Sequence, residues 1–481
     1  MNTTNYYVDL HCHPALKPYG KSFNRTKSGK NAVRRSSKNS IWHYDPPSVF
    51  DKVLNYLTGL TKFSQSNFSA MAYGEVGVVC VSLYPMEKWF VRNKMNNEFL
   101  LDLAANFATG LGKKRIDHIQ GFTDYFKDLE AEYDFYKQLD GKVVRLKEGK
   151  FRYRIVNSYN EIEVIKAQEQ EQGIFTVCVI LSIEGLHVLN TGFKEDPDGQ
   201  EVLRNLQTIK NWEHPPMFVT LAHHFWNHIC GHEESFSGII KKQADQRFGL
   251  GLGFTNLGNQ VLDLLLDGTK GKQILVDVKH MSVKARYQYY EVLEQTESYS
   301  TLPVIISHGA ANGLKSPQEP VMVYLETAQK LQQNTINFYD EELILLAKSG
   351  GIIGLQLDER RVASEQTLKT TRHATRRHKI MHYRSELLWN QIQHILEVLD
   401  AEGMFAWDCM AIGSDFDGII DPLNAFWTAE ELPYLSDFLE RHAYNYVQKG
   451  RIHHEFNKIP AGEMIDRVMT LNAMAFLQKH F

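Results

Sequence analysis

Residues 6–14 read YYVDLHCHP, a short apolar strand that ends in two histidines one position apart. Side chains at positions i and i+2 of a strand lie on the same face. His11 and His13 are therefore expected to point together, while Cys12 faces the other side. Two imidazoles side by side at the end of a strand can hold a metal ion. Pro14 cannot continue the strand, so both histidines are predicted to lie at its carboxyl end.

Further apolar runs follow along the chain, and segments with a helical pattern lie between them. The expected strands cover residues 6–10, 75–83, 174–183, 217–221, 273–278, 303–307, 350–355 and 410–415. The expected helices cover residues 88–109, 122–139, 159–172, 200–211, 258–267, 282–296, 340–348 and 385–402. Asp340 is predicted to be the N-cap of its helix, and a terminal helix at 463–479 is expected on the outside. Near-continuous apolar runs are typical of strands buried on both faces of a parallel sheet.

Eight strands that alternate with helices predict an α/β protein with a (β/α)8 TIM barrel, formed by residues 1–481 as one domain. A doubly wound open sheet is the alternative, but no glycine-rich phosphate loop follows any expected strand. Three long segments are expected to be insertions, at about 15–50, 85–160 and 357–384.

The first insertion is basic and directly follows His13. We expect it to form part of a lid over the mouth of the barrel. The second insertion is expected to be mostly helical, and the third carries several arginines. For each charged run, a solvated surface remains the alternative.

Composition limits the partners and the compartment. Hydrophobic residues make up 43%, charged residues 23%, and the net charge is −4, so neither nucleic acid nor a membrane is an expected partner. The five cysteines show no paired spacing, which predicts free thiols in a reducing, cytoplasmic environment. The N-terminus lacks a signal-peptide pattern, and no apolar run approaches the ~20 residues that cross a bilayer. A homo-oligomer remains open.

Potential metal ligands recur at the carboxyl ends of the expected strands, where barrel enzymes have their active sites. Besides the two histidines of the first strand, they are Glu184, His223, His224, His280, His308, Asp415 and Asp417. Imidazoles and carboxylates in this number suit zinc or another divalent transition metal. A carboxylate such as Glu184 can bridge two ions, and paired ions promote hydrolysis by polarising a carbonyl and activating water.

In order and type, these motifs resemble the membrane (renal) dipeptidase family of metal-dependent amidohydrolases. The resemblance is carried by VDLHCH at 8–13, IEG at 183–185, VTLAH at 219–223, GFTNLG at 253–258, VDVKHMS at 276–282, ISH at 306–308 and IGSDFDG at 412–418. The motifs run almost from end to end of the chain, with large insertions between them. The last motif is the most distinctive.

The resemblance implies an amidohydrolase-type barrel that cleaves dipeptides or dipeptide-like small molecules with two zinc ions. It implies five metal ligands, with Glu184 as the bridge: His11 and His13 on one ion, and His280 and His308 on the other. It also implies that His223 contacts the substrate or its tetrahedral intermediate. Asp415 would carry a proton between water and the leaving amine.

Two positions depart from the family pattern. His13 stands where the family usually has an aspartate, which keeps a metal ligand but removes one negative charge. Ile336 stands where the family tends to carry an arginine that meets the substrate carboxylate. Either another cation replaces that arginine, or the substrate has no carboxylate there. The candidate cations are Arg360, Arg361, Arg372, Arg376 and Arg377 after the seventh strand, with Lys315 as a weaker candidate.

Two other functions stay open from the sequence. The same metals can hydrolyse another small carbonyl compound, such as an N-acyl amino acid or a lactone. A barrel that has lost catalysis and only binds metal is the third possibility. Retention of Glu184, His280, His308 and Asp415 argues against it.

Overall fold

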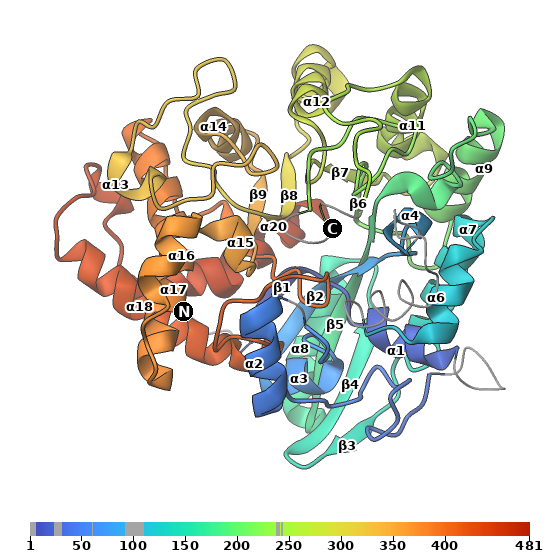
Figure 1. The fold of residues 1–481 in the computed structure, drawn as a ribbon, viewed down its shortest axis with the longest axis horizontal. Coiled ribbons are helices and arrows are strands. Elements are labelled where there is room, and N and C mark those ends of the chain that lie inside the picture. Colours follow the sequence, from blue (N-terminus) through green and yellow to red (C-terminus); the bar gives the residue numbers. More distant parts are fainter. Residues whose placement is uncertain (1–5, 24–30, 60, 92–109, 237–240, 242–243) are drawn as a thin grey trace.

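In the computed structural model, eight parallel strands form a closed barrel with helices around it (Figure 1). The structure describes residues 6–23, 31–59, 61–91, 110–236, 241 and 244–481. The barrel strands are β1 (Tyr7–Cys12), β2 (Val76–Leu83), β5 (Ile174–Glu184), β6 (Phe218–Thr220), β7 (Leu275–Asp277), β8 (Ile305–Gly309), β9 (Ile352–Leu355) and β10 (Met410–Ile412). The β1–β10 and β2–β5 pairs close the ring. The predicted (β/α)8 barrel is therefore confirmed, and the open sheet is excluded.

The helices follow the strands in the order expected for this fold. Before β5 they are α1 (Leu16–Ser22), α2 (Val49–Thr58), α3 (Phe68–Tyr73), α4 (Lys88–Val91), α6 (Lys113–Gln120), α7 (Tyr125–Lys137) and α8 (Tyr159–Gln172). Between β5 and β9 they are α9 (Gly199–Lys210), α11 (Asn256–Leu266), α12 (Val283–Gln295), α13 (Leu325–Ala328) and α14 (Asp340–Lys348). After β9 they are α15 (Glu359–Val362), α16 (Glu365–Thr371), α17 (Arg377–Ala401), α18 (Leu432–Val447), α19 (Ala461–Asp466) and α20 (Asn472–His480).

The insertion at 85–160 differs from the mostly helical prediction. It contains an antiparallel hairpin, β3 (Val144–Leu146) and β4 (Gly149–Ile155), and β4 runs parallel to the first half of β5. Because β5 is much longer than its neighbour β6, its first half would otherwise be an open edge, and β4 covers that edge. Of the helix predicted at 88–109, the structure shows α4, and residues 92–109 lie outside the described residues.

Two helix starts also differ from the prediction. Helix α17 begins at Arg377 rather than at residue 385, because the apolar pattern in the sequence begins only after its charged first turn. Asp340 is the first residue of α14, and Tyr339 takes the N-cap position. The Asp340 carboxylate instead lies 2.8 Å from Nε2 of His394 on α17, so its side chain joins two helices.

The two faces of the barrel strands belong to separate buried clusters. Val79, Val81 and their equivalents pack with the surrounding helices. The alternate positions, such as Val78 and Cys80, share a cluster with Phe476 and Leu477 of α20. The terminal helix therefore closes the amino-terminal end of the barrel, and its predicted place on the outside is wrong. Figure 1 accordingly shows α20 and the C-terminus within the ring of strands.

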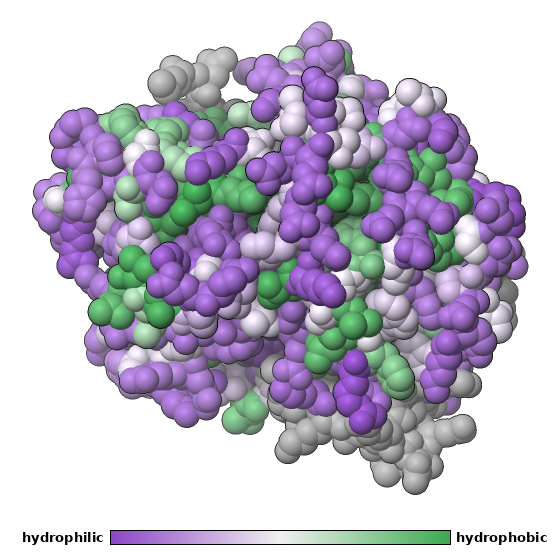
Figure 2. Space-filling view, turned by 90° about the horizontal axis from the view of Figure 1, so that it is seen from above, coloured by the Kyte–Doolittle hydropathy of each residue, from purple (hydrophilic) through white to green (hydrophobic). Residues whose placement is uncertain are grey.

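The interior becomes polar toward the carboxyl ends of the strands. The inward positions that follow the apolar ones are all buried: Ser82, Ser182, Thr220, Asp277 and Ser307. An apolar floor and a polar upper layer place ionisable side chains at one end of the barrel. None of the described helices is both long and apolar enough to cross a bilayer, and polar side chains cover most of the face drawn in Figure 2.

Candidate active site

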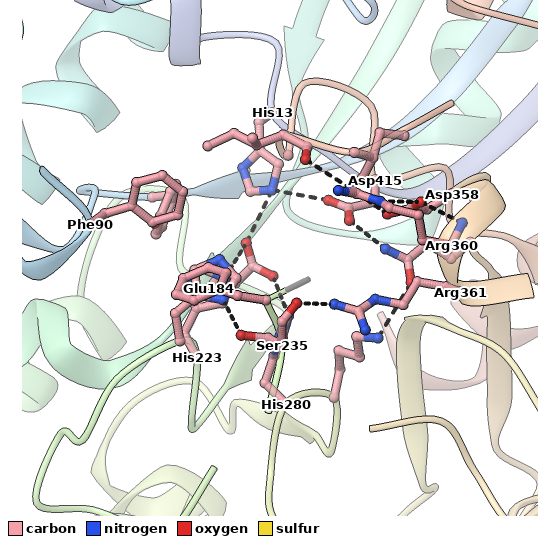
Figure 3. Close-up of a pocket in the computed structure, with 18 of the residues that line it drawn as sticks. His13, Phe90, Glu184, His223, Ser235, His280, Asp358, Arg360, Arg361 and Asp415 are labelled. Carbon is pink, nitrogen blue, oxygen red and sulfur yellow. Dashed lines mark hydrogen bonds and ion pairs between the residues drawn. The ribbon is translucent and has the colours of Figure 1, made fainter. Parts of the chain in front are cut away.

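Four histidine rings from three strand ends surround the Glu184 carboxylate, which ends β5. Figure 3 shows two of them, His13 and His280, on either side of Glu184. The Nε2 atoms of His11, His280 and His308 lie 3.5, 3.3 and 3.4 Å from Oε1. The Nε2 atom of His13 lies 3.1 Å from Oε2. All five side chains are buried. The structure thus brings the five predicted ligands together, and metal binding by them stays a prediction.

An irregularity in β1 turns both of its histidines into the barrel. The register against β2 shifts between Asp9 and Cys12, as in a β-bulge. The Asp9 carboxylate stabilises this bend because it accepts hydrogen bonds from the backbone N–H groups of His11, at 3.2 Å, and Ser414, at 2.8 Å. Burial raises the pKa of Asp9 to about 6, against these hydrogen bonds.

The other ring nitrogen of three histidines already has a partner. Nδ1 of His11 and Nδ1 of His308 lie 3.3 and 2.9 Å from the Ser307 hydroxyl oxygen. Nδ1 of His13 lies 3.2 Å from the carbonyl oxygen of Ser82. The Ser307 hydroxyl in turn donates to Asp277 at 2.6 Å. Such partners fix the ring orientation and leave Nε2 for a metal ion.

The spacing of the Nε2 atoms fits zinc. The Nε2 atoms of His11 and His13 are 3.1 Å apart, and those of His280 and His308 are 3.3 Å apart. Two nitrogens at ~2.0–2.1 Å from one tetrahedral zinc ion are about 3.3 Å apart. Each pair can therefore hold one ion, with an oxygen of Glu184 close to both.

His223 lies beside the same carboxylate and is held by an acidic residue that the sequence analysis missed. Its Nδ1 lies 2.9 Å from Oε1 of Glu87, and its Nε2 lies 3.5 Å from Oε2 of Glu184. Burial acts against protonation, but the charges of Glu87 and Glu184 raise the pKa of His223. Glu87 follows β2, and its position after a strand end was the signal that could have found it.

Asp415 follows β10 and faces the histidines of β1. Its Oδ1 lies 3.8 Å from Nε2 of both His11 and His13. Its Oδ2 accepts a hydrogen bond of 2.6 Å from Nε2 of Gln356. Burial and then the charge of Glu184 raise the pKa of Asp415 to about 8. A φ of 59° places the residue in the left-handed region, a strained conformation that is common at functional sites.

Asp417, the other acidic residue of this motif, has a structural role. Its carboxylate accepts hydrogen bonds from Lys17 Nζ at 2.5 Å and from the backbone N–H groups of Gln65 and Ser66 at 3.0 and 2.8 Å. It fastens this segment to the barrel, so Asp415 remains the acidic residue of the motif that faces the histidines.

Glycine at position 418 leaves room for the Asp415 side chain. A Cβ atom at this position would lie 1.9 Å from Oδ1 of Asp415, which is far inside a van der Waals contact. The glycine of the IGSDFDG motif therefore keeps the carboxylate in place next to the histidines.

Two of the predicted arginines line the pocket above these residues. The pocket is partly open to solvent, and histidine, carboxylate, arginine and aromatic side chains line it. Arg360 is paired with Asp358 through two hydrogen bonds, at 3.0 and 2.9 Å. Arg361 donates to the carbonyl oxygen of Ser235 and forms no ion pair with any carboxylate in the described part of the chain. The remaining candidates, Arg372, Arg376, Arg377 and Lys315, are not among the described residues that line the pocket.

Ile336 is fully buried and is absent from the described wall of the pocket. The next residue, Asn337, donates from its side chain to the backbone carbonyl oxygen of Arg361 at 2.8 Å. The segment in which the family tends to carry its arginine therefore supports the backbone of a different arginine here.

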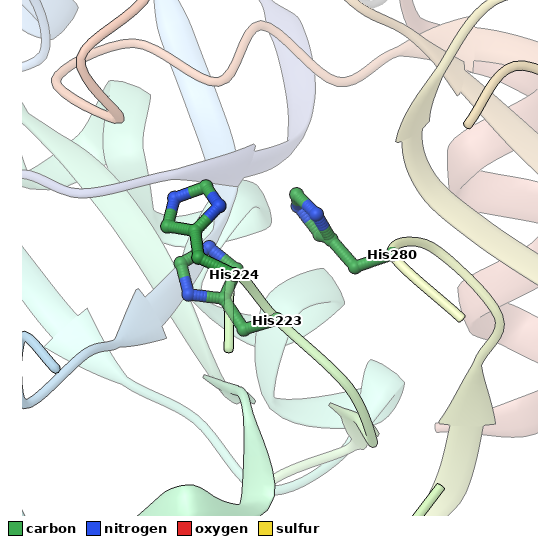
Figure 4. A group of neighbouring side chains, drawn as sticks. All are labelled: His223, His224 and His280. Atoms are coloured by element: carbon green, nitrogen blue, oxygen red, sulfur yellow. The ribbon is translucent and has the colours of Figure 1, made fainter. Parts of the chain in front are cut away.

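Several wall residues were not predicted as site residues: Tyr84, Phe90, Phe236, Lys279 and Gln356. His224, predicted as a potential ligand at a strand end, also lines the wall. Figure 4 shows His224 next to His223 and His280. Ligand atoms of these three histidines lie within 4.8 Å of one another. The Nδ1 atom of His224 lies 2.8 Å from the Ser235 hydroxyl, and burial holds its pKa well below the usual range. The basic insertion at 15–50 contributes Leu16 to the wall.

A family model described as membrane dipeptidase (Peptidase family M19) matches residues 42–451. The chain belongs to the membrane dipeptidase family. This is a family of metal-dependent dipeptidases, and the match includes the site residues named above other than His11, His13 and their neighbours before residue 42. The prediction that His11 and His13 bind metal therefore rests on their positions around Glu184. No curated protein matched the chain.

Several solved structures are similar to this membrane dipeptidase family protein at low identity. A metallopeptidase of family M19 named dipeptidase AC is 12% identical, with 99% of each chain covered and a TM-score of 0.49. A metallopeptidase from Rhodobacter sphaeroides, liganded with a phosphinate mimic of the dipeptide L-Ala-D-Ala, is 13% identical, with 99% and 100% covered and a TM-score of 0.46. An amidohydrolase from Pseudomonas aeruginosa is 16% identical, with 85% and 91% covered and a TM-score of 0.43.

Proposed function

We propose that this protein uses two zinc ions to hydrolyse the amide bond of a dipeptide or a dipeptide-like small molecule. The observation that carries the proposal is the convergence of four Nε2 atoms on the two oxygens of Glu184. Buried imidazoles this close to one carboxylate and to one another fit a shared pair of cations. The pocket above them is lined by imidazole, carboxylate and guanidinium groups, which suits a small polar substrate.

The residues divide into metal ligands and groups that act on the substrate. His11 and His13 would hold one ion, His280 and His308 the second, and Glu184 both. When bound, the ions supply Lewis acidity toward the substrate carbonyl and toward water. All other roles belong to side chains of this chain.

Asp415 moves the proton in this proposal. Its Oδ1 faces the histidines of β1, so it can take a proton from the attacking water and pass it to the leaving nitrogen. The carboxylate must be ionised to begin. Bound cations favour that form and oppose the effect of burial on its pKa.

His223 stabilises the charge that develops on the substrate oxygen. Glu87 holds Nδ1, and the raised pKa of the ring makes Nε2 a donor that faces the site. A positioned donor in a water-poor site is worth more in the transition state than in solution.

Arg361 is the cation that we expect to bind the substrate carboxylate. Arg360 already has Asp358 as a bidentate partner, whereas Arg361 lines the pocket without such a partner among the described residues. An arginine can grip a carboxylate with two hydrogen bonds. The wild type should prefer a dipeptide over its C-terminal amide, and Arg361→Met should remove that preference. Arg372→Met, outside the pocket, should keep it. Equal rates on acid and amide in the wild type would refute this role.

A substrate panel tests the proposed function itself. Zinc-loaded protein is offered dipeptides, N-acetyl amino acids and a lactone, with and without a chelator. We expect chelator-sensitive cleavage of dipeptides. Cleavage of only the N-acetyl amino acids or the lactone would assign the site to the alternative hydrolase. Zinc binding without any turnover would make the barrel a binding protein.

A further inference from the structure

Gln356 lies between Lys279 and Asp415 in the wall of the active-site pocket. Its Nε2 donates to Oδ2 of Asp415 at 2.6 Å, and its Oε1 lies 3.4 Å from Nζ of Lys279. The exposed fractions are 3% for Gln356, 1% for Lys279 and 7% for Asp415. Buried polar groups as close as these determine one another's orientation.

Lys279 determines which way the Gln356 amide points. A lysine amine offers N–H donors, and an ionised carboxylate offers only acceptors. The amide oxygen therefore faces Lys279, and the amide nitrogen faces Asp415. The reverse orientation would set N–H groups against the amine and an oxygen against the carboxylate. The 3.4 Å contact with Lys279 thus favours the amide orientation that the 2.6 Å hydrogen bond to Asp415 requires.

Because the Gln356 amide nitrogen donates to Oδ2 of Asp415, this oxygen must act as an acceptor and carry no proton. A proton on Asp415 is then confined to Oδ1, the oxygen that faces the Nε2 atoms of His11 and His13 at 3.8 Å. Within the described residues, Oδ1 has no other polar side chain in contact. The two carboxylate oxygens therefore differ in function, one held and the other free to exchange a proton.

We propose that Gln356, oriented by Lys279, is a positioning residue that holds Oδ2 of Asp415 and assigns proton transfer to Oδ1. This inference rests on the proposed function, because it concerns the group that carries the proton in amide hydrolysis. No site residue of strand seven was predicted before the arginines. Gln356 supplies one, directly after β9.

The Gln356 side chain is not needed for the barrel itself. Its backbone N–H donates to the carbonyl oxygen of Gly309 at 2.9 Å, and this strand contact does not involve the side chain. A substitution that keeps the length of the side chain should therefore leave the fold and the metal ligands in place.

Gln356→Met is the first test. We expect kcat to fall by ~10–100-fold, the usual cost of losing a partner of this kind, with KM and zinc content unchanged. The acid limb of the pH profile of kcat should move to higher pH, because a carboxylate that loses a donor holds its proton more tightly. The isosteric Gln356→Glu should move it further, because it adds a second carboxylate beside Asp415. Lys279→Met should shift it in the same direction by less.

Gln393→Met is the matched control. Gln393 is also a buried glutamine, and its Nε2 donates to Oε1 of Glu397 at 2.8 Å, away from the pocket. It should leave kcat and the pH profile unchanged. An unshifted acid limb in Gln356→Met and Gln356→Glu would overturn the inference while the proposed function stands.

A second measurement does not depend on a substrate. Crystal structures of the wild type and of Gln356→Met follow the orientation of the Asp415 carboxylate directly. Gln356→Met should leave the metal ligands in place and release the Asp415 side chain from its present orientation, and an unmoved Asp415 would overturn the inference. A wild type that cleaves no dipeptide would refute the proposed function instead.

Discussion

At the scale of single residues, burial and charge act in opposite directions on Glu184. Burial disfavours its ionised form, but the charge of His223 and then that of His11 hold its pKa well below the usual range. The carboxylate is therefore ionised before any metal arrives. The same surroundings leave protons on other groups, which a metal ion must displace.

Zinc binding is predicted to release protons. The hydrogen bond and charge of Glu184 outweigh burial and raise the pKa of His13 to about 9, and the pKa of Asp415 is about 8. Both groups carry a proton at neutral pH in the metal-free protein, and a bound cation favours their loss. Titration of zinc into weakly buffered protein at pH 7 should release about two protons per molecule. The number should fall as the pH is raised through 8 and 9. Release that does not change with pH would contradict these pKa values.

Gly418→Ala is predicted to separate catalysis from metal binding. The added Cβ meets Oδ1 of Asp415, so the carboxylate must move, while none of the metal ligands is changed. Turnover should fall by ~100-fold or more, with zinc content unchanged in elemental analysis. Gly462→Ala, where the nearest atom is a side-chain oxygen 3.4 Å away, should leave both unchanged. Native turnover in Gly418→Ala would show that Asp415 need not sit where the structure has it.

At the scale of elements, the sequence was most informative where burial is uniform. The eight barrel strands appear as apolar runs because both of their faces are covered, and Glu184, His280 and His308 could be found as polar residues where those runs end. The hairpin β3–β4 could not be found this way, because the uneven lengths of β5 and β6 decide its place. Gln356 was missed because only the folded barrel shows what its side chain meets. Glu87 could have been found from its position after β2, but its contact with His223 is visible only in the structure.

Helix α20 is predicted to be an essential part of the barrel. Leu477 is fully buried in the cluster that fills the barrel interior. Leu477→Ala should cost ~2–5 kcal/mol of stability, measured as a lower thermal unfolding midpoint. The exposed neighbour substitution Gln478→Ala should have little effect. Equal unfolding midpoints for the two variants would contradict the position of Leu477 inside the barrel and would favour a terminal helix on the outside.

At the scale of the whole molecule, one end of the barrel is apolar and sealed, and the other carries the ionisable groups. Leu16 shows that the basic insertion at 15–50 reaches the pocket wall, and the role of this insertion as a lid stays a prediction. All site residues from β1 to β10 meet only because the ring closes between β1 and β10. The central claim is that this meeting point holds two zinc ions.

The most direct test is anomalous X-ray diffraction at the zinc edge from crystals of zinc-loaded protein. We predict two peaks, one next to His11 and His13 and one next to His280 and His308, with Glu184 between them. Glu184→Gln should lose at least one peak, because a neutral amide bridges two cations poorly, while the control Glu171→Gln on exposed α8 should keep both. No zinc peak at Glu184 in the wild type, or one confined to another part of the molecule, would contradict the account.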